Sequence, residues 1–188
     1  MGNKTLELVK YYHFLRERDI NDSHSGNGSV RDGDSLWITP TGACADTLQP
    51  WQIVRCALEG AAAAGASSDL ALHRQVYLRN PRARAVLHGH AVHAIALTMD
   101  GNPFEPVDLE GDLYFTHGVS VIDIPYENYF SASPALVGEA LASHPAVIVR
   151  GHGLYAWGEN LNQAYKWLCS LELAARIKYL ALRSGTLD

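Results

Sequence analysis

Three histidines stand where the ends of strands could bring them together. His88 closes an apolar run that begins at Ala85, and His90 follows after a single glycine. If the strand persists through His90, both side chains leave the same face, because successive strand residues alternate. His152 follows the apolar run 146–149, with a glycine on either side. Three histidines with an open fourth position typify a catalytic zinc, so these residues predict a metal site.

A His-x-His pair alone is weak evidence for a metal, and the interpretation depends on His152 in its Gly-His-Gly setting. His93 falls on the helix expected after the pair, where we expect it to pack or to support the site from outside. His73 lies in another expected helix and could donate a hydrogen bond to a ligand, or could be purely structural. The other histidines carry no spacing argument: His13, His24, His117 and His144.

The elements that must position these residues alternate between helix and strand. Helices are predicted for residues 4–18, 67–79, 91–98, 133–143 and 160–184, and strands for residues 36–39, 52–58, 85–88, 119–124 and 146–150. Two helix starts have capping signals: the serines before Asp69, and the Asn160 and Gln163 pair. The polar stretch 21–29 is expected to be a loop. Hairpin-like segments within residues 36–58 favour a mixed sheet in an α/β or α+β domain.

Composition excludes several classes of protein. The chain has 188 residues, of which 47% are hydrophobic, and this suits one compact domain spanning residues 1–188. Its formal charge of −5, without a cluster of Lys or Arg, argues against nucleic-acid and anionic-membrane partners. No run approaches the roughly 20 apolar residues of a membrane helix. Three scattered cysteines predict free thiols in a reducing cytoplasm.

Five short segments occur in the order typical of the class II aldolase/adducin family, which the sequence resembles from about residue 5 to residue 182. They are Ser-Gly-Asn-Gly-Ser at 25–29, Ile-Thr-Pro-Thr-Gly at 38–42, Ser-Ser-Asp at 67–69, Val-Leu-His-Gly-His at 86–90 and Arg-Gly-His-Gly-Leu-Tyr-Ala-Trp-Gly at 150–158. The resemblance implies a three-layer α/β/α sandwich around a mixed, largely antiparallel sheet. It also implies a homotetramer with sites between subunits.

The resemblance implies a zinc site, or a site for another divalent metal, held by His88, His90 and His152. It further implies a substrate-phosphate site at Asn27, Thr41, Gly42, Ser67 and Ser68. The two serines precede a predicted helix, where N–H groups and the helix dipole favour an anion. Gly42 would let the backbone approach that anion closely. His24 replaces the threonine usual before the Ser-Gly-Asn segment, which could alter the phosphate contacts.

Two carboxylates are the candidate acid and base. Asp69 stands where many aldolases of the family have a glutamate, and we expect it to be a general base or a metal ligand. The alternative is an acidic residue that only stabilises a helix start. The second acid or base comes from segment 108–114, where the resemblance does not decide between Glu110 and Tyr114. We favour Glu110. The alternative interpretation is that Glu110 is only an exposed carboxylate in a loop.

Together these residues predict a zinc-dependent lyase. It would cleave a ketose 1-phosphate by a retro-aldol reaction to dihydroxyacetone phosphate and an aldehyde, with the metal as Lewis acid. The same site could instead dehydrate its substrate, as methylthioribulose-1-phosphate dehydratase does, or serve a sugar-phosphate decarboxylase or epimerase. A third interpretation is a non-catalytic interaction module, as in adducin-like members, but those lack the metal histidines that stand here.

Overall fold

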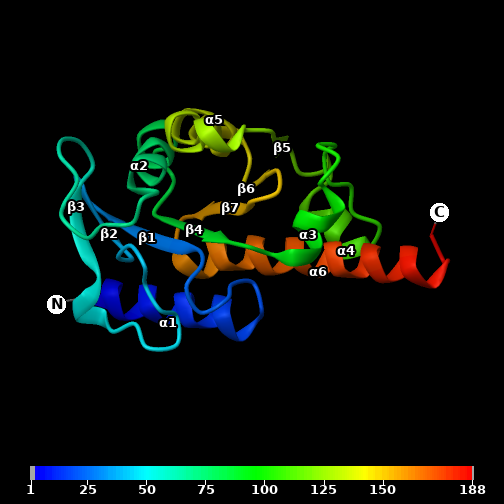
Figure 1. Cartoon of the computed structure of the whole chain (residues 1–188), viewed down its shortest axis with the longest axis horizontal. Coiled ribbons are helices and arrows are strands. Elements are labelled where there is room, and N and C mark those ends of the chain that lie inside the picture. The colour runs from blue at the N-terminus through cyan, green and yellow to red at the C-terminus, as the bar shows by residue number, and fades with distance from the viewer. Residues whose placement is uncertain (1–2, 188) are drawn as a thin grey trace.

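The structure is a computed structural model that describes residues 3–187, so both ends of the expected 1–188 domain lie outside the described residues. A seven-stranded sheet forms its centre (Figure 1). The strands are β1 (Asn27–Asp32), β2 (Ser35–Ile38), β3 (Val54–Ala57), β4 (Ala85–Gly89), β5 (Val121–Ile122), β6 (Ala146–Val149) and β7 (Gly153–Gly158). Their order is β3-β2-β1-β4-β7-β6-β5, and every neighbouring pair is antiparallel except β5 and β6.

Helices cover both faces of this sheet. They are α1 (Asn3–Glu17), α2 (Leu70–Arg79), α3 (Val92–Leu97), α4 (Leu109–Tyr114), α5 (Tyr129–Ser143) and α6 (Leu161–Ser184), with 3-10 turns at Pro50–Gln52 and Tyr126–Asn128. Figure 1 shows α2 and α5 on one side and α1 and α6 on the other, each pair over its own apolar cluster. The expected three-layer α/β/α fold with a mixed, largely antiparallel sheet is therefore confirmed. None of the helices within residues 3–187 combines the length and apolarity needed to cross a bilayer.

Alternation along the central strand decides which way the site faces. Ala85 and Leu87 of β4 belong to the cluster under α1 and α6, whereas Val86 belongs to the cluster under α2 and α5. Because alternate strand residues share a face, His88 follows Val86 toward α2 and α5. The predicted metal site therefore lies at the end of β4, on the face of the sheet that α2 and α5 cover.

Several element boundaries differ from the sequence-based predictions. Residues 27–29 were expected in a polar loop but start strand β1, which β2 and β4 flank on both sides. Strand β7 and helix α4 were not predicted at all. Helix α5 begins at Tyr129, ahead of the predicted serine N-cap at Ser133, and contains Pro134. In each case tertiary pairing or packing overrides the local pattern.

Helix α6 begins and ends where capping chemistry predicts. The Asn160 side chain accepts a hydrogen bond from the Gln163 backbone N–H at 2.9 Å, and the Gln163 side chain accepts from the Glu159 N–H at 2.8 Å. Gly185 follows the helix with a positive φ of 70°, a conformation that glycine adopts without strain. The predicted apolar stripe is buried: Leu161, Ala164, Leu168, Leu171 and Ala175.

We predict that Asn160→Ala lowers the free energy of unfolding by about 1 kcal/mol, because the first turn of α6 loses its cap. Urea unfolding followed by circular dichroism measures this loss. Asn160→Asp is the matched control, since it keeps the acceptor and should remain close to the parent protein. An unchanged midpoint for the alanine variant would contradict this account of the helix start.

Candidate metal centre and active-site pocket

The structure brings the three predicted histidines together. His88 lies on β4, His90 follows that strand, and His152 lies in the turn between β6 and β7. The Nε2 atom of His88 is 3.0 Å from Nε2 of His90 and 3.1 Å from Nε2 of His152. They converge because β7 pairs with β4 on one side and with β6 on the other.

The donor atoms of this cluster fit a divalent metal ion. Nδ1 of His88 donates to the Leu154 carbonyl at 2.9 Å, which leaves its Nε2 lone pair directed at the other two rings. Burial lowers the pKa of His88, His90 and His152, so the neutral forms that bind metals are favoured. Ligand nitrogens of a tetrahedral zinc lie about 3.3 Å apart at ordinary Zn–N lengths, close to the observed spacing.

The two glycines around His152 have different structural roles. Gly151 has a φ of 66°, which closes the turn after β6. Gly153 lies so close to β4 that an added Cβ atom would meet the Gly89 carbonyl oxygen at 2.5 Å and Cε1 of His88 at 3.0 Å. Only a residue without a side chain lets β7 bring His152 this near to His88.

Three side chains form a row across the sheet, with His88 of the histidine cluster in the middle. Asn27 of β1 is in register with His88 of β4, and His88 is in register with Tyr155 of β7. The His88 and Tyr155 rings stack, with their centroids 4.0 Å apart and their planes 4° apart. Asp69, directly before α2, reaches this row from the helical layer and contacts Asn27 and Tyr155.

Asp69 is turned toward the site and not toward its own helix. It occupies the N-cap position of α2, but its side chain makes no capping hydrogen bond. Oδ2 accepts from Asn27 Nδ2 at 2.9 Å and from the Tyr155 hydroxyl at 2.8 Å. Burial raises the pKa of Asp69, but the hydrogen bonds that it accepts from Asn27 and Tyr155 favour the charged form, and its pKa lies below the ordinary value. The carboxylate is therefore ionised and held in one orientation, unlike a simple helix-start acid.

Tyr129 joins the site although the sequence did not point to it. It is the first residue of α5, and its hydroxyl lies 3.4 Å from Asp69 Oδ1 and 3.2 Å from His152 Nε2, in direct contact with the Tyr155 hydroxyl. Burial and the charge of Asp69 raise the pKa of Tyr129, so it holds its proton at neutral pH. The only hint in the sequence was a tyrosine close to the start of α5, and that start was predicted too late.

All five residues expected to hold phosphate line one pocket with the histidines and Asp69. The pocket has a volume of about 290 Å³, and its lining includes Asn27, Thr41, Gly42, Ser67, Ser68, Tyr129 and also His24. Two loops form its wall, joined by hydrogen bonds from Thr41 N to the Gly65 carbonyl at 3.0 Å and from Ser67 N to the Thr39 carbonyl at 3.2 Å. The predicted phosphate site is thus one continuous surface beside the metal cluster, and its role stays a prediction.

Glu110 and Tyr114 are not brought to this pocket within the chain. They lie on α4 and line a separate cavity against α6, where the Tyr114 hydroxyl donates to Glu110 at 3.2 Å. The reason is the path of the chain after α3, which leads α4 onto α6 and away from the ends of β4 and β7. Within one chain, Tyr129 is therefore the further acid or base that this pocket offers, and the role predicted for Glu110 stays a prediction.

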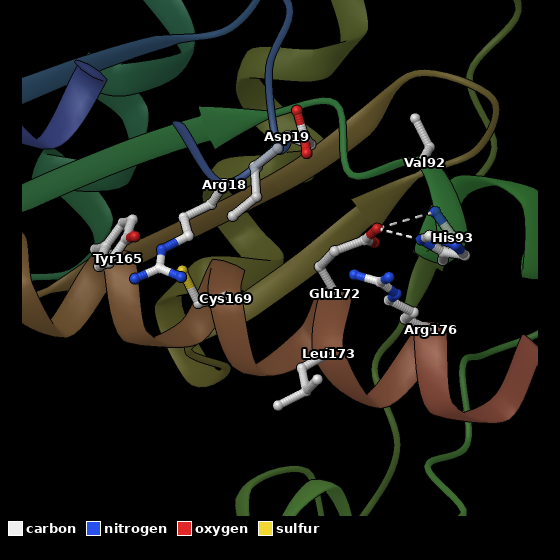
Figure 2. A pocket seen from close by; sticks show the side chains of 10 residues that line it. Arg18, Asp19, Val92, His93, Tyr165, Cys169, Glu172, Leu173 and Arg176 are labelled. Carbon is white, nitrogen blue, oxygen red and sulfur yellow. Dashed lines mark hydrogen bonds and ion pairs between the residues drawn. The ribbon is translucent and has the colours of Figure 1, made fainter. Parts of the chain in front are cut away.

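A third cavity, of about 580 Å³, lies between the end of α1, helix α3 and helix α6 (Figure 2). There Glu172 of α6 holds the first turn of α3. Its Oε1 accepts from His93 Nδ1 at 2.6 Å and from the His93 backbone N–H at 3.2 Å, and its Oε2 accepts from the Ala94 N–H at 3.2 Å. The N-cap residue of α3, Ala91, has no capping side chain. Glu172 thus replaces the missing cap on the helix that starts directly after His90.

We predict that Glu172→Ala weakens metal binding about 10-fold, because the segment that carries His90 loses its anchor. Competition with a chromogenic chelator measures the dissociation constant. Glu159→Ala is the matched control, since this exposed acid pairs with Arg82 far from α3 and should leave metal affinity unchanged. Equal metal affinity in the Glu172 variant and the parent would disprove the anchoring role.

Comparison with known proteins places this fold and site in a family. The family model of the class II aldolase and adducin N-terminal domain matches residues 6–179, and the chain belongs to this family. Class II aldolases use a divalent metal, and the cluster of His88, His90 and His152 offers the donors for one.

Relatives in the family differ in their reactions. A methylthioribulose-1-phosphate dehydratase of Acidiphilium cryptum is 33% identical over 92% of this chain and 88% of its own length. A 3-oxo-tetronate 4-phosphate decarboxylase of Cupriavidus necator is 31% identical over 91% and 81%. The crystal structure of L-fuculose-1-phosphate aldolase from Thermus thermophilus is 31% identical, superposes with a TM-score of 0.89 and covers all of both chains. The family supports an enzyme, and these relatives do not single out one reaction.

Proposed function

We propose that the protein is a metal-dependent carbon–carbon lyase. Its substrate would be a ketose 1-phosphate, cleaved by a retro-aldol reaction to dihydroxyacetone phosphate and an aldehyde. The observation that carries the proposal is one pocket with an ionised Asp69, three histidines whose Nε2 atoms converge and the loops expected to bind phosphate. The structural likeness to L-fuculose-1-phosphate aldolase, with a TM-score of 0.89, supports the same reaction class.

Asp69 and Tyr129 supply the proton transfers of this reaction. Asp69 takes the proton from the hydroxyl next to the bond that breaks, and that carbon becomes the aldehyde. The electron pair of the carbon–carbon bond passes into an enediolate, whose carbon then takes the proton of the Tyr129 hydroxyl. Because Tyr129 lies 3.4 Å from Asp69 Oδ1, the proton on Asp69 can return to the tyrosine and close the cycle. A bound zinc or other divalent ion supplies Lewis-acid stabilisation of the negative oxygen atoms.

The phosphate end of the substrate would lie against the wall formed by Thr41, Gly42, Ser67 and Ser68. The N-terminal end of α2 presents backbone N–H groups after Ser67 and Ser68, and its dipole favours an anion. Gly42 has a φ of 66°, so the Thr41–Gly42 turn leaves its backbone open to the pocket. Asn27 uses one amide hydrogen on Asp69 and keeps a second for a ligand. Binding there would hold the ketone end in place for proton transfer.

Dehydration is the second candidate, and the dehydratase relative at 33% identity favours it. Asp69 would take a proton from the carbon beside the ketone, and Tyr129 would protonate the hydroxyl that leaves. Decarboxylation is supported in the same way by the relative at 31% identity, and an epimerase would use the same groups. A non-catalytic adducin-like module is disfavoured because all three histidines stand together.

A panel of ketose 1-phosphates separates the candidate reactions. The zinc-loaded protein is expected to release dihydroxyacetone phosphate, detected with a coupled reductase. A diketone phosphate as product would establish the dehydratase instead, and carbon dioxide released from 3-oxo-tetronate 4-phosphate would establish the decarboxylase. If none of these substrates yields a product, the proposal that the protein is an enzyme is wrong.

We predict that His88→Ala abolishes metal content and turnover together, because His88 is the central donor of the cluster. Metal analysis by mass spectrometry and the panel assay measure the two losses. His144→Ala is the control, since this exposed side chain hydrogen-bonds within its own turn, to Ser143 and to the Ala140 carbonyl, and its loss should leave both unchanged. A His88 variant that keeps metal and turnover would overturn the proposal.

Assembly and compartment also remain proposals. We propose a homotetramer whose subunits cover large apolar side chains, including Tyr126 and the pocket-lining Phe130, which are 92% and 67% exposed in the single chain. Light scattering is expected to give the mass of four chains, and a monomeric mass would contradict it. The three cysteines are free thiols, in keeping with the proposed cytoplasmic location.

A further inference from the structure

Helix α2 and strand β1 face each other with matched side-chain spacing. Asp69, His73 and Tyr77 follow one another at intervals of four residues, which on a helix places them on one face about 6 Å apart along the axis. Asn27 and Ser29 share one face of β1, with a separation of about 6.6 Å. The two rows therefore interleave, and each strand residue lies between two helix residues.

A continuous chain of hydrogen bonds joins these residues. The Tyr77 hydroxyl lies 2.7 Å from Ser29 Oγ, and Ser29 Oγ lies 2.7 Å from Nδ1 of His73. Nε2 of His73 lies 2.7 Å from Asn27 Oδ1, and Asn27 Nδ2 lies 2.9 Å from Asp69 Oδ2. Ser29 and His73 are fully buried, and the other three side chains are buried as well.

The carboxylate of Asp69 sets the direction of every bond in this chain. An ionised carboxylate only accepts, so Asn27 must turn its amide N–H toward Asp69 and its carbonyl oxygen toward His73. A carbonyl oxygen also only accepts, so Nε2 of His73 carries the ring proton and Nδ1 accepts from Ser29. The Ser29 oxygen then accepts from the Tyr77 hydroxyl. All donors thus point toward Asp69, an arrangement in which successive bonds strengthen one another.

We propose that His73 is a positioning residue: its Nε2–H holds the Asn27 amide in the one orientation that donates to Asp69, and thereby aligns the carboxylate. The inference rests on the proposed function only in giving Asp69 the role of base. A neutral ring is required, because a charged ring would have no acceptor for Ser29. Burial agrees with this, since it lowers the pKa of His73 to about 4 despite the opposing charge of Asp69.

Removal of His73 has a specific consequence for the site. Without the Nε2–H donor, the Asn27 carbonyl oxygen is buried and unpaired, and the amide is free to rotate. The rotated amide would present its carbonyl oxygen to the Asp69 carboxylate, and the two acceptors would repel. The base would then be misaligned with the substrate while the three histidines keep their places.

Two substitutions at His73 test this role. His73→Leu removes the donor, and we expect kcat to fall about 100-fold, as misplacement of a reacting group does, with metal content unchanged. His73→Gln keeps a donor toward Asn27 and an acceptor toward Ser29, and should restore most of the lost kcat. Asn80→Ala is the control: this buried side chain ends the same helix and bonds to the Leu141 carbonyl, so it should cost stability but not kcat.

A measurement of the His73 tautomer separates this inference from the proposed function. Nitrogen-15 NMR of the ring in the wild-type protein is expected to show a protonated Nε2 and an unprotonated Nδ1, whether or not any substrate is turned over. A protonated Nδ1, a doubly protonated ring, a leucine variant with full kcat or a glutamine variant as slow as a folded leucine variant would each overturn the inference. If His73→Leu does not fold, the kcat of the glutamine variant and the tautomer of the wild-type ring test the inference. Absence of turnover in the wild type with the expected tautomer would count against the proposed function alone.

Discussion

The register between β1, β4 and β7 holds Asn27, His88 and Tyr155 in one row across the sheet, and the pocket is built on that row. A slip of one residue in either pairing would turn one of these side chains to the opposite face. The register also decides where His152 arrives, because Gly153 passes β4 within van der Waals distance. The convergence of the three histidines is therefore a consequence of how three strands align.

Asp69 is the second centre of the site, and its charge organises the polar groups around it. Asn27 and Tyr155 donate to one carboxylate oxygen, and Tyr129 lies against the other. On one side the carboxylate faces the histidine cluster. On the other side, the carboxylate accepts from Asn27, the last donor in the chain of hydrogen bonds between α2 and β1. A buried carboxylate with this many donors is stable as a charge and has a defined direction.

The sequence predicted the parts of the site that depend on local spacing. The histidines, the phosphate loops and Asp69 stand beside glycines, strand ends or a helix start, and the structure brings all of them to one pocket. It did not predict contacts that depend on tertiary placement. Strand β1 was missed because its residues are polar, although its neighbours pair with it on both edges. Tyr129 was not predicted, and the place of Glu110 in a separate cavity of the chain was not foreseen, because no local pattern fixes where α4 and α5 dock.

The central claim is that His88, His90 and His152 hold one divalent ion beside Asp69. Crystals of the zinc-loaded protein, measured at the zinc absorption edge, test it most directly. The account predicts one strong anomalous peak per chain, about 2.1 Å from each of the three Nε2 atoms. A peak at other residues, or none at this cluster with zinc in excess, would contradict it.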